Sequence, residues 1–227
     1  MNHRTFKTAF INTLPILTGY VFLGFAFGLL MKTKGFPGWL PVLMSVVIYS
    51  GAMEYATVPV LAQAFDPLGS FVLAVMLSAR HLFYGLPMLG KYDKTGAVKP
   101  FLIFGLTDET FSLLSTSDVP EGLEPGSYYT AVTLLDYSYW CGGTLLGAVF
   151  GNLVSFNAEG LDFALTALFI VLFVEQLKDK EGKISGLTGL VLSAAALAVF
   201  GKGNMVIASM ALILAALLLL KKVIVHE

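Results

Sequence analysis

The chain has 227 residues, of which 56% are hydrophobic and 13% are charged, and its mean hydropathy is +0.79. A soluble domain carries about 25% charged residues, so this chain has too few to cover a surface that faces water. The net charge of −1 argues against nucleic acid as a partner. The composition therefore predicts one integral membrane domain, residues 1–227, in a lipid bilayer.

The N-terminal segment passes from basic residues into an apolar run, Ala9–Met31, of 23 residues without a charge. This run is about twice as long as the apolar part of a signal peptide, so it predicts a retained membrane helix. Seven more apolar stretches follow: Trp39–Gln63, Pro67–Leu89, Pro100–Leu114, Tyr128–Val154, Leu161–Leu177, Ile184–Phe200 and Asn204–Leu220. Each is expected to be a helix, because a lone strand in lipid leaves its backbone groups unpaired.

The most polar link, residues 115–127, divides the chain into halves, 1–114 and 128–227. The stretch before it, Pro100–Leu114, spans about 22 Å as a helix, which is short of the roughly 30 Å hydrocarbon core. Eight full crossings would place seven lysines and arginines inside and six outside. If Pro100–Leu114 instead returns to the inner side, and the N-terminus lies outside, the numbers become ten and three. We therefore expect an all-α integral membrane protein, a polytopic helical bundle of about seven crossings plus one re-entrant or broken helix.

Glycines predict where the helices pack closely. Gly24 and Gly28 form one small-residue step, and two more steps follow at Gly143, Gly147 and Gly151. The face formed by Gly143, Gly147 and Gly151 is a candidate docking face for a partner, and alternatively it packs against another helix of this chain. Helix breakers are also frequent, and they predict interrupted helices of the kind that build transporter sites, at Pro15, Pro59 and the segment Gly85–Pro87.

Charged residues inside the apolar stretches are the candidate site: Glu54, Arg80, Asp108, Glu109 and Asp136. A charge at a helix centre costs about 2.5–3.5 kcal/mol on insertion scales, so such residues mark functional sites. One arginine can neutralise only one of the four carboxylates, and the others need water, a bound cation or a proton. Alternatively, Asp136 and the pair Asp108–Glu109 lie near the membrane surface and are hydrated.

The remaining candidates are few. His81 follows Arg80, and a histidine can relay protons, but adjacent helical residues point about 100° apart, so at most one of the two is expected to face a cavity. Cys141 is the sole cysteine, and the histidines are widely separated, so neither a metal site nor a cofactor is expected. Ser78 and His81 are three residues apart, but no nucleophile turn surrounds Ser78, so an intramembrane protease is disfavoured and no enzymatic activity is expected.

Motifs along nearly the whole chain resemble the AzlC family, the large subunit of the bacterial branched-chain amino acid exporters. They are PILTGYVFLGFAFG (15–28), YSGAMEY (49–55), SARHLFYGLPM (78–88), FGLTDETFSL (104–113), YWCGGTLLGAVFG (139–151) and GKGN (201–204). The resemblance implies export of leucine, isoleucine, valine and similar apolar amino acids, beside a small hydrophobic AzlD-like subunit. The motif GAMEY departs from the family at Glu54, where the family more often carries glutamine.

We therefore predict a multi-pass transporter of the bacterial cytoplasmic (inner) membrane, coupled to the proton gradient. Arg80 and Glu54 are expected to line a cavity near mid-membrane, with Asp108 close by. A zwitterionic amino acid needs a cation for its carboxylate, an acceptor for its ammonium group and an apolar pocket, and these residues supply the charges. A transporter of another small solute, either another amino acid or an organic ion, meets the same requirements. An ATP-driven permease is a weaker alternative, because the chain contains no P-loop.

Overall fold

The structure, a computed structural model, describes residues 2–62, 66–93, 95–116, 118–153 and 180–224, with single positions between 163 and 177. These residues form helices and turns, and no strand occurs among them. The expected all-helical class is confirmed. The chain falls into two compact units, Met1–Ala164 and Leu165–Glu227.

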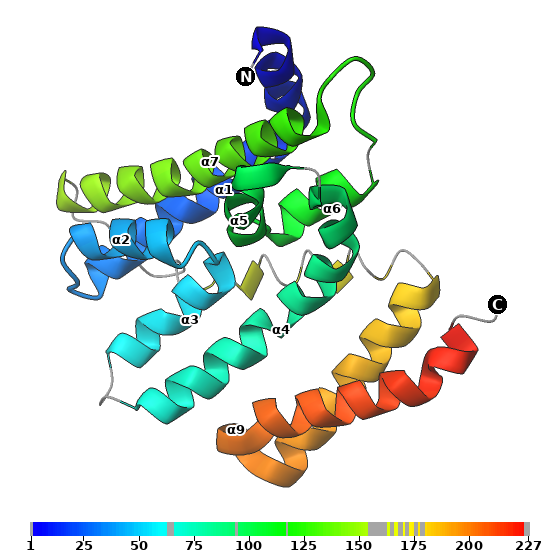
Figure 1. Ribbon diagram of the computed structural model, residues 1–227. Helices are drawn as coiled ribbons and strands as arrows, with labels where there is room; N and C mark the ends of the chain where they lie inside the picture. Colours follow the sequence, from blue (N-terminus) through cyan, green and yellow to red (C-terminus); the bar gives the residue numbers. More distant parts are fainter. Residues whose placement is uncertain are drawn as a thin grey trace. The chain divides into compact units, whose positions relative to one another are not determined.

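The first unit contains a helix pair and several shorter helices (Figure 1). The second apolar stretch, expected as one continuous helix, is broken at 48–50. The fourth, expected as a re-entrant or broken helix, is broken at 105–107. The elements are α1 (His3–Thr33), α2 (Trp39–Val47), α3 (Gly51–Leu61), α4 (Pro67–Tyr92), η1 (Gly96–Val98), α5 (Lys99–Phe104), α6 (Asp108–Thr116) and α7 (Pro125–Leu153).

The two long helices α1 and α7 form the main contact of this unit and lie side by side in Figure 1. Glycines allow the backbones to approach. A Cβ atom added at Gly24 would lie 2.7 Å from the carbonyl oxygen of Trp140, and one at Gly143 would lie 2.7 Å from that of Val21. A Cβ atom added at Gly28 or at Gly147 would lie even closer to backbone atoms of the opposite helix. The predicted close packing is confirmed, and the glycines of α7 form an internal face against α1 rather than a docking face for a partner.

Helices α4 and α7 begin in the same way, with an acidic residue followed by proline. The Asp66 carboxylate accepts a hydrogen bond from the Gly69 backbone N–H at 2.9 Å. The Glu124 carboxylate accepts from the backbone N–H groups of Gly126 and Ser127, at 2.9 and 2.6 Å. Hydrogen bonds from Ser127 and Gly126 hold the pKa of Glu124 below its usual value. Proline in the first turn loses no helical hydrogen bond, so these sequences start helices efficiently.

The expectation that prolines interrupt helices is wrong. Helices α1, α3 and α4 continue through Pro15, Pro59 and Pro87. An internal proline removes one hydrogen bond and bends the helix, and neighbouring helices in a membrane protein can compensate for that loss. The actual interruptions lie elsewhere, at 48–50 and 105–107.

The second unit contains α9 (Lys180–Ile224), whose two halves correspond to the seventh and eighth apolar stretches. They are separated at Gly201, where φ is 67° and ψ is 177°, a conformation that favours glycine. The halves contact each other, since a Cβ atom at Gly189 would lie 3.9 Å from Cδ1 of Ile213. The sixth predicted stretch, Leu161–Leu177, falls mostly outside the described residues.

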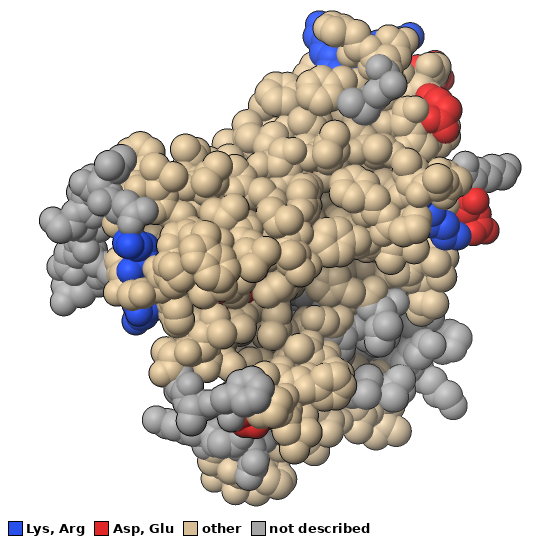
Figure 2. Space-filling view, turned by 60° about the vertical axis from the view of Figure 1, so that its left-hand side comes forward, with Lys and Arg blue, Asp and Glu red and all other residues tan. Residues whose placement is uncertain are grey.

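Large apolar side chains are exposed on both units, with Phe22 and Phe71 66% exposed and Val199 74% exposed. Figure 2 shows a face that is largely uncharged, with charged side chains gathered at a few places. Such a surface is stable in lipid and not in water. Among the described residues, His3–Thr33 and Lys183–Gly201 are long and apolar enough to cross a bilayer. The number of crossings, and the division into halves at 115–127, remain predictions.

Candidate functional site

The first helix break places Glu54 at the start of α3. Tyr49 has a φ of 46°, a left-handed conformation that costs a bulky residue about 1–2 kcal/mol, and Ser50 is extended. Helix α3 therefore begins anew at Gly51. The Glu54 carboxylate reaches back to accept a hydrogen bond from the Ser50 backbone N–H at 3.1 Å. A carboxylate in the first turn is also stabilised by the helix dipole.

Glu54 is fully buried, and a tryptophan covers it. The indole Nε1–H of Trp140 on α7 donates to both carboxylate oxygens, at 3.0 and 3.1 Å. Gly51 makes room for this ring, because a Cβ atom there would lie 2.7 Å from an indole carbon. Glu54 is thus held by two neutral N–H donors in the described part of the chain.

The second break starts α6 with acidic residues. Gly105 ends α5, and Thr107 precedes α6 and accepts a hydrogen bond from the Thr110 backbone N–H at 3.3 Å. This is the geometry of a threonine N-cap. Asp108 and Glu109 occupy the first helical turn, where negative charge is favourable.

Aromatic rings join the two breaks on the surface of α7. The ring of Tyr49 lies 4.8 Å from that of Tyr137 and 6.1 Å from that of Phe104, which is the last residue of α5. The rings of Phe104 and Tyr137 are 6.2 Å apart. These contacts compensate for the strained backbone at Tyr49. The restarted helices α3 and α6 are therefore both anchored at the middle of α7.

A continuous row of hydrogen-bonded oxygens runs from α6 through α1 to α7. The Tyr20 hydroxyl on α1 donates to Glu109 at 2.7 Å and lies 2.6 Å from the Thr107 hydroxyl. The hydroxyls of Thr107 and Thr110 are 3.0 Å apart, and Thr110 donates to Asp136 at 2.7 Å. We call the hydroxyl groups of Tyr20, Thr107 and Thr110 the hydroxyl chain. It links two carboxyl groups that come from different helices.

Asp136 lies at the buried end of this row. Its side chain is fully buried, and its Oδ1 atom has no hydrogen-bond partner among the described residues. The Thr133 hydroxyl, one turn earlier on α7, is likewise buried without a described partner. An unsatisfied carboxylate oxygen is costly in a low-dielectric interior, so this end of the row is suited to hold a proton or a polar group.

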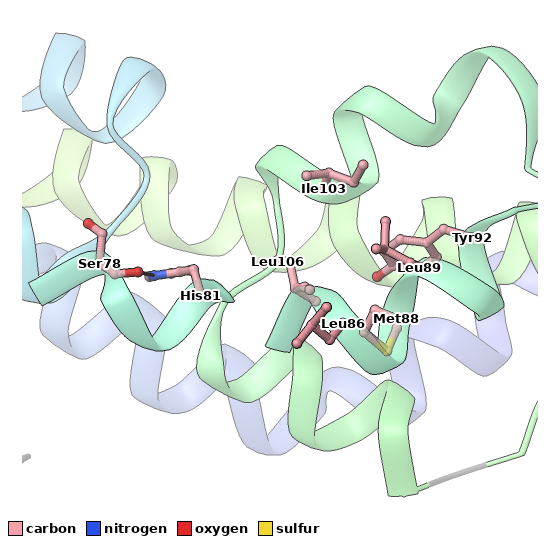
Figure 3. Close-up of a pocket in the computed structure, with 9 residues that line it drawn as sticks. Ser78, His81, Leu86, Met88, Leu89, Tyr92, Ile103 and Leu106 are labelled. Atoms are coloured by element: carbon pink, nitrogen blue, oxygen red, sulfur yellow. Dashed lines mark hydrogen bonds between the residues drawn. The ribbon is translucent and has the colours of Figure 1, made fainter. Parts of the chain in front are cut away.

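An apolar pocket of about 400 Å³ lies between α4 and the second break (Figure 3). Its polar wall comes from Ser78 and His81, with His81 Nδ1 3.2 Å from the carbonyl oxygen of Ser78. Leu106 contributes from the break. The remaining lining residues are Gly85, Leu86, Met88, Leu89, Tyr92 and Ile103. The pocket is large enough for a small apolar side chain and adjoins the residue that precedes Thr107.

Comparison with known proteins identifies the family. Residues 15–154 match the profile of the AzlC protein family. The chain belongs to the AzlC family. It is 46% identical over 217 residues to the branched-chain amino acid transport protein AzlC of Bacillus subtilis, an alignment that covers 96% of this chain and 85% of that protein. An AzlC relationship was expected from the motifs and is confirmed.

Other relatives are named as membrane proteins. An uncharacterised membrane protein of Helicobacter pylori is 34% identical over 96% of both chains. The inner membrane protein YgaZ of Escherichia coli is 29% identical over 86% of both chains. No solved structure matches the chain. The AzlC family match and the names of these relatives identify this chain as a membrane transporter.

The structure places the predicted site residues in two groups: the carboxyl groups near Trp140 and Tyr20, and His81 in the pocket wall. Glu54, Glu109 and Asp136 gather around Trp140 and Tyr20, whose rings meet edge to face at 5.7 Å. Asp108 begins α6 beside Glu109.

His81 lies in the pocket wall, while the side chain of Arg80 falls outside the described residues. Neither Glu54 nor Asp108 lines this pocket. Asp136 is buried rather than hydrated at a surface.

Four residues of the site were not among the predictions: Tyr20, Thr107, Thr110 and Trp140. Sequence signals point to two of them, Tyr20 and Thr107. Tyr20 precedes Gly24 and Gly28 at the same four-residue spacing, so it lies on the face of α1 that packs against α7. Thr107 comes two residues after Gly105 and directly before two acidic residues, which is the pattern of a helix that stops and restarts with a threonine cap.

Proposed function

We propose that this chain exports branched-chain or similar apolar amino acids across the bacterial cytoplasmic membrane. It does so as a multi-pass secondary transporter coupled to the proton gradient, beside a small AzlD-like hydrophobic subunit. The substrate class rests on the name of the B. subtilis relative, a branched-chain amino acid transport protein. An inner-membrane location is supported by the name of the E. coli relative.

The observation that carries the proposal is that the helix break at 105–107 belongs both to the apolar pocket and to the hydroxyl chain. On one side of it, Leu106 lines an apolar pocket of about 400 Å³. On the other side, Thr107 belongs to the hydroxyl chain that joins two carboxyl groups. An apolar amino acid requires an apolar pocket near charged groups, and a proton-coupled carrier requires buried carboxyl groups near its substrate site.

The charged groups of the substrate need partners of opposite sign. Arg80 directly precedes His81, which lines the pocket, and its guanidinium is the candidate partner for the substrate carboxylate. Asp108 or Glu54, each in the first turn of a restarted helix, is the candidate partner for the ammonium group. The apolar side chain then enters the pocket beside Leu106.

Transport of labelled leucine in liposomes tests the proposal. The chain, purified with a co-expressed AzlD-like subunit, should exchange internal for external leucine and should drive net movement when a pH gradient is imposed. A panel of competing solutes identifies the class, since leucine, isoleucine and valine should compete and organic anions should not. Absence of leucine exchange with strong exchange of another solute would refute the substrate class.

The partner and the topology have tests of their own. Full transport by the chain alone would refute the need for the small subunit. In a Cys141→Ser background, cysteines at Thr95 and Gly122 should be labelled from the same side of the membrane. This is the expectation for seven crossings with a fourth segment that returns to the side it entered. Labelling from opposite sides would refute that topology.

A further inference from the structure

The row from Glu109 to Asp136 contains more oxygen–oxygen contacts than its hydroxyl groups have protons to turn into hydrogen bonds. It has four oxygen–oxygen contacts, at 2.7, 2.6, 3.0 and 2.7 Å. All are within hydrogen-bonding distance, and each requires one proton between its oxygens. The hydroxyl chain supplies only three such protons, one each from Tyr20, Thr107 and Thr110.

With both carboxyl groups ionised, one contact therefore lacks a proton. Tyr20 then donates to Glu109 and Thr110 donates to Asp136, so Thr107 can donate to only one of its two hydroxyl neighbours. The remaining pair of oxygens would face each other with lone pairs alone. A single additional proton, on Glu109 or on Asp136, completes the row.

We infer that the hydroxyl chain is a proton path between Glu109 and Asp136, which carries the proton that is exchanged for substrate. This inference rests on the proposed function. When the extra proton is on Glu109, each hydroxyl donates toward Asp136. When every proton shifts by one oxygen, each O–H bond that breaks is replaced by one that forms, and the proton resides on Asp136. The net change is one proton moved from Glu109 to Asp136, with no redox step.

The two ends differ in access, as a path requires. Glu109 is partly exposed, whereas Thr110 and Asp136 are fully buried. Among the described residues, Tyr49 in the first break interacts electrostatically with Glu109, Asp136 and Glu54 of α3, and Tyr139 on α7 interacts with Asp136. Asp108 lies beside Glu109 in the first turn of α6. Glu54 is bound by Trp140, and Tyr139 is hydrogen-bonded to Thr13 at 3.1 Å, so each has a partner outside the row.

The break at 105–107 connects this path to the pocket. Leu106 is in the pocket wall, and its neighbour Thr107 is the central member of the hydroxyl chain. Residues in a helix break have fewer backbone hydrogen bonds than helical residues, so they move at lower cost. A substrate that displaces Leu106 also moves the Thr107 hydroxyl, and so opens or closes the row. This makes proton movement depend on pocket occupancy.

The test separates exchange from proton coupling in liposomes, with labelled leucine as the probe. Exchange is measured at equal pH on both sides, net transport is measured under a pH gradient, and a trapped pH dye reports proton movement. Tyr20→Phe keeps the ring and removes one hydroxyl, and Thr107→Val keeps the shape and removes another. In each variant the ratio of gradient-driven transport to exchange should fall at least about tenfold, with proton movement lost in parallel.

Two controls make the result specific. Tyr55→Phe removes an equally buried tyrosine hydroxyl, which donates to the Leu23 carbonyl oxygen at 2.8 Å, and should leave the ratio unchanged. Thr107→Ser retains a hydroxyl and should restore the ratio that Thr107→Val loses. A wild-type ratio in both Tyr20→Phe and Thr107→Val would overturn the path, as would an equal loss of exchange and driven transport. Absence of leucine exchange in the wild type would instead refute the proposed function.

Discussion

The crossing of α1 and α7 predicts opposite effects for two adjacent glycines. A methyl group at Gly143 would lie 2.7 Å from the Val21 carbonyl oxygen and 2.9 Å from its Cα atom. Carbon atoms pack at about 3.5–4.0 Å, so α1 must retreat by roughly 0.6–1 Å at this point. Backbone atoms cannot rotate away as a side chain can. At Gly142, a methyl group meets nothing within 4 Å.

The magnitudes follow from these contacts. Overpacking costs about 1–3 kcal/mol, so Gly143→Ala should lower the melting temperature in detergent by about 2–12 °C, given about 2–4 °C per kcal/mol in chains of this size. Gly142→Ala should leave it unchanged or raise it slightly, because alanine is favoured over glycine in a helix by about 0.5–1 kcal/mol. Gly143→Ala should also slow leucine transport, since Tyr20 and Trp140 meet at this crossing.

The assay is a thermal melt of the purified protein, followed by size-exclusion chromatography, with both variants and the wild type at equal concentration. Equal melting temperatures for Gly142→Ala and Gly143→Ala would refute the assigned helix crossing. A lower temperature for Gly142→Ala than for Gly143→Ala would show that the packed face of α7 has been assigned to the wrong side.

Three further predictions concern the site itself. Glu54→Gln should retain transport and alter its pH dependence, which a pH series of transport measures. Glu54→Ala should destabilise the protein by about 1–3 kcal/mol, because the Trp140 N–H loses its acceptor, and thermal melts measure this loss. Arg80→Ala should abolish leucine transport, and Asp108→Asn should abolish coupling or binding; wild-type rates in both at matched expression would mean that these charges are structural. Gly85→Leu should raise the KM for leucine at least about tenfold and affect alanine less, because Gly85 lines the pocket and a Cβ atom there meets nothing within 4 Å, so that the new side chain takes up pocket space. Equal effects on both amino acids in uptake assays would contradict this.

The helices could be predicted because lipid imposes a simple rule on apolar stretches. An uncharged run such as Ala9–Met31 has no alternative to a helix, and the structure has α1 there. The glycine steps likewise predicted a close crossing, but not which helices cross. Spacing shows that Gly143 and Gly147 share a face, and only the three-dimensional structure shows that this face meets Gly24 and Gly28.

The breaks could not be predicted as readily, for a physical reason. The first one, at 48–50, contains neither glycine nor proline, and it exists because Tyr49 gains ring contacts on α7 that outweigh an unfavourable φ. Such a tertiary contact leaves no local signature. The second break has one, in the order Gly105, Thr107, Asp108, and the short length of Pro100–Leu114 already indicated a re-entrant or broken helix there. The prolines elsewhere gave a wrong indication, because the helices continue through them.

The two helix breaks differ in whether the contacts around them can change. Tyr49 is held by the rings of Tyr137 on α7 and Phe104 on α5, and α7 is in turn fixed to α1 by backbone contacts that no side-chain motion can relax. The contacts of the second break include the four oxygen–oxygen contacts of the row and the apolar wall at Leu106. In the proposed mechanism both change with occupancy, by a proton in one case and by an apolar ligand in the other. A rigid helix pair beside a segment whose contacts change with occupancy is the arrangement that alternating access requires. In the proposed mechanism, coupling between substrate and proton needs no long-range pathway, because Leu106 lines the pocket and Thr107 belongs to the hydroxyl chain.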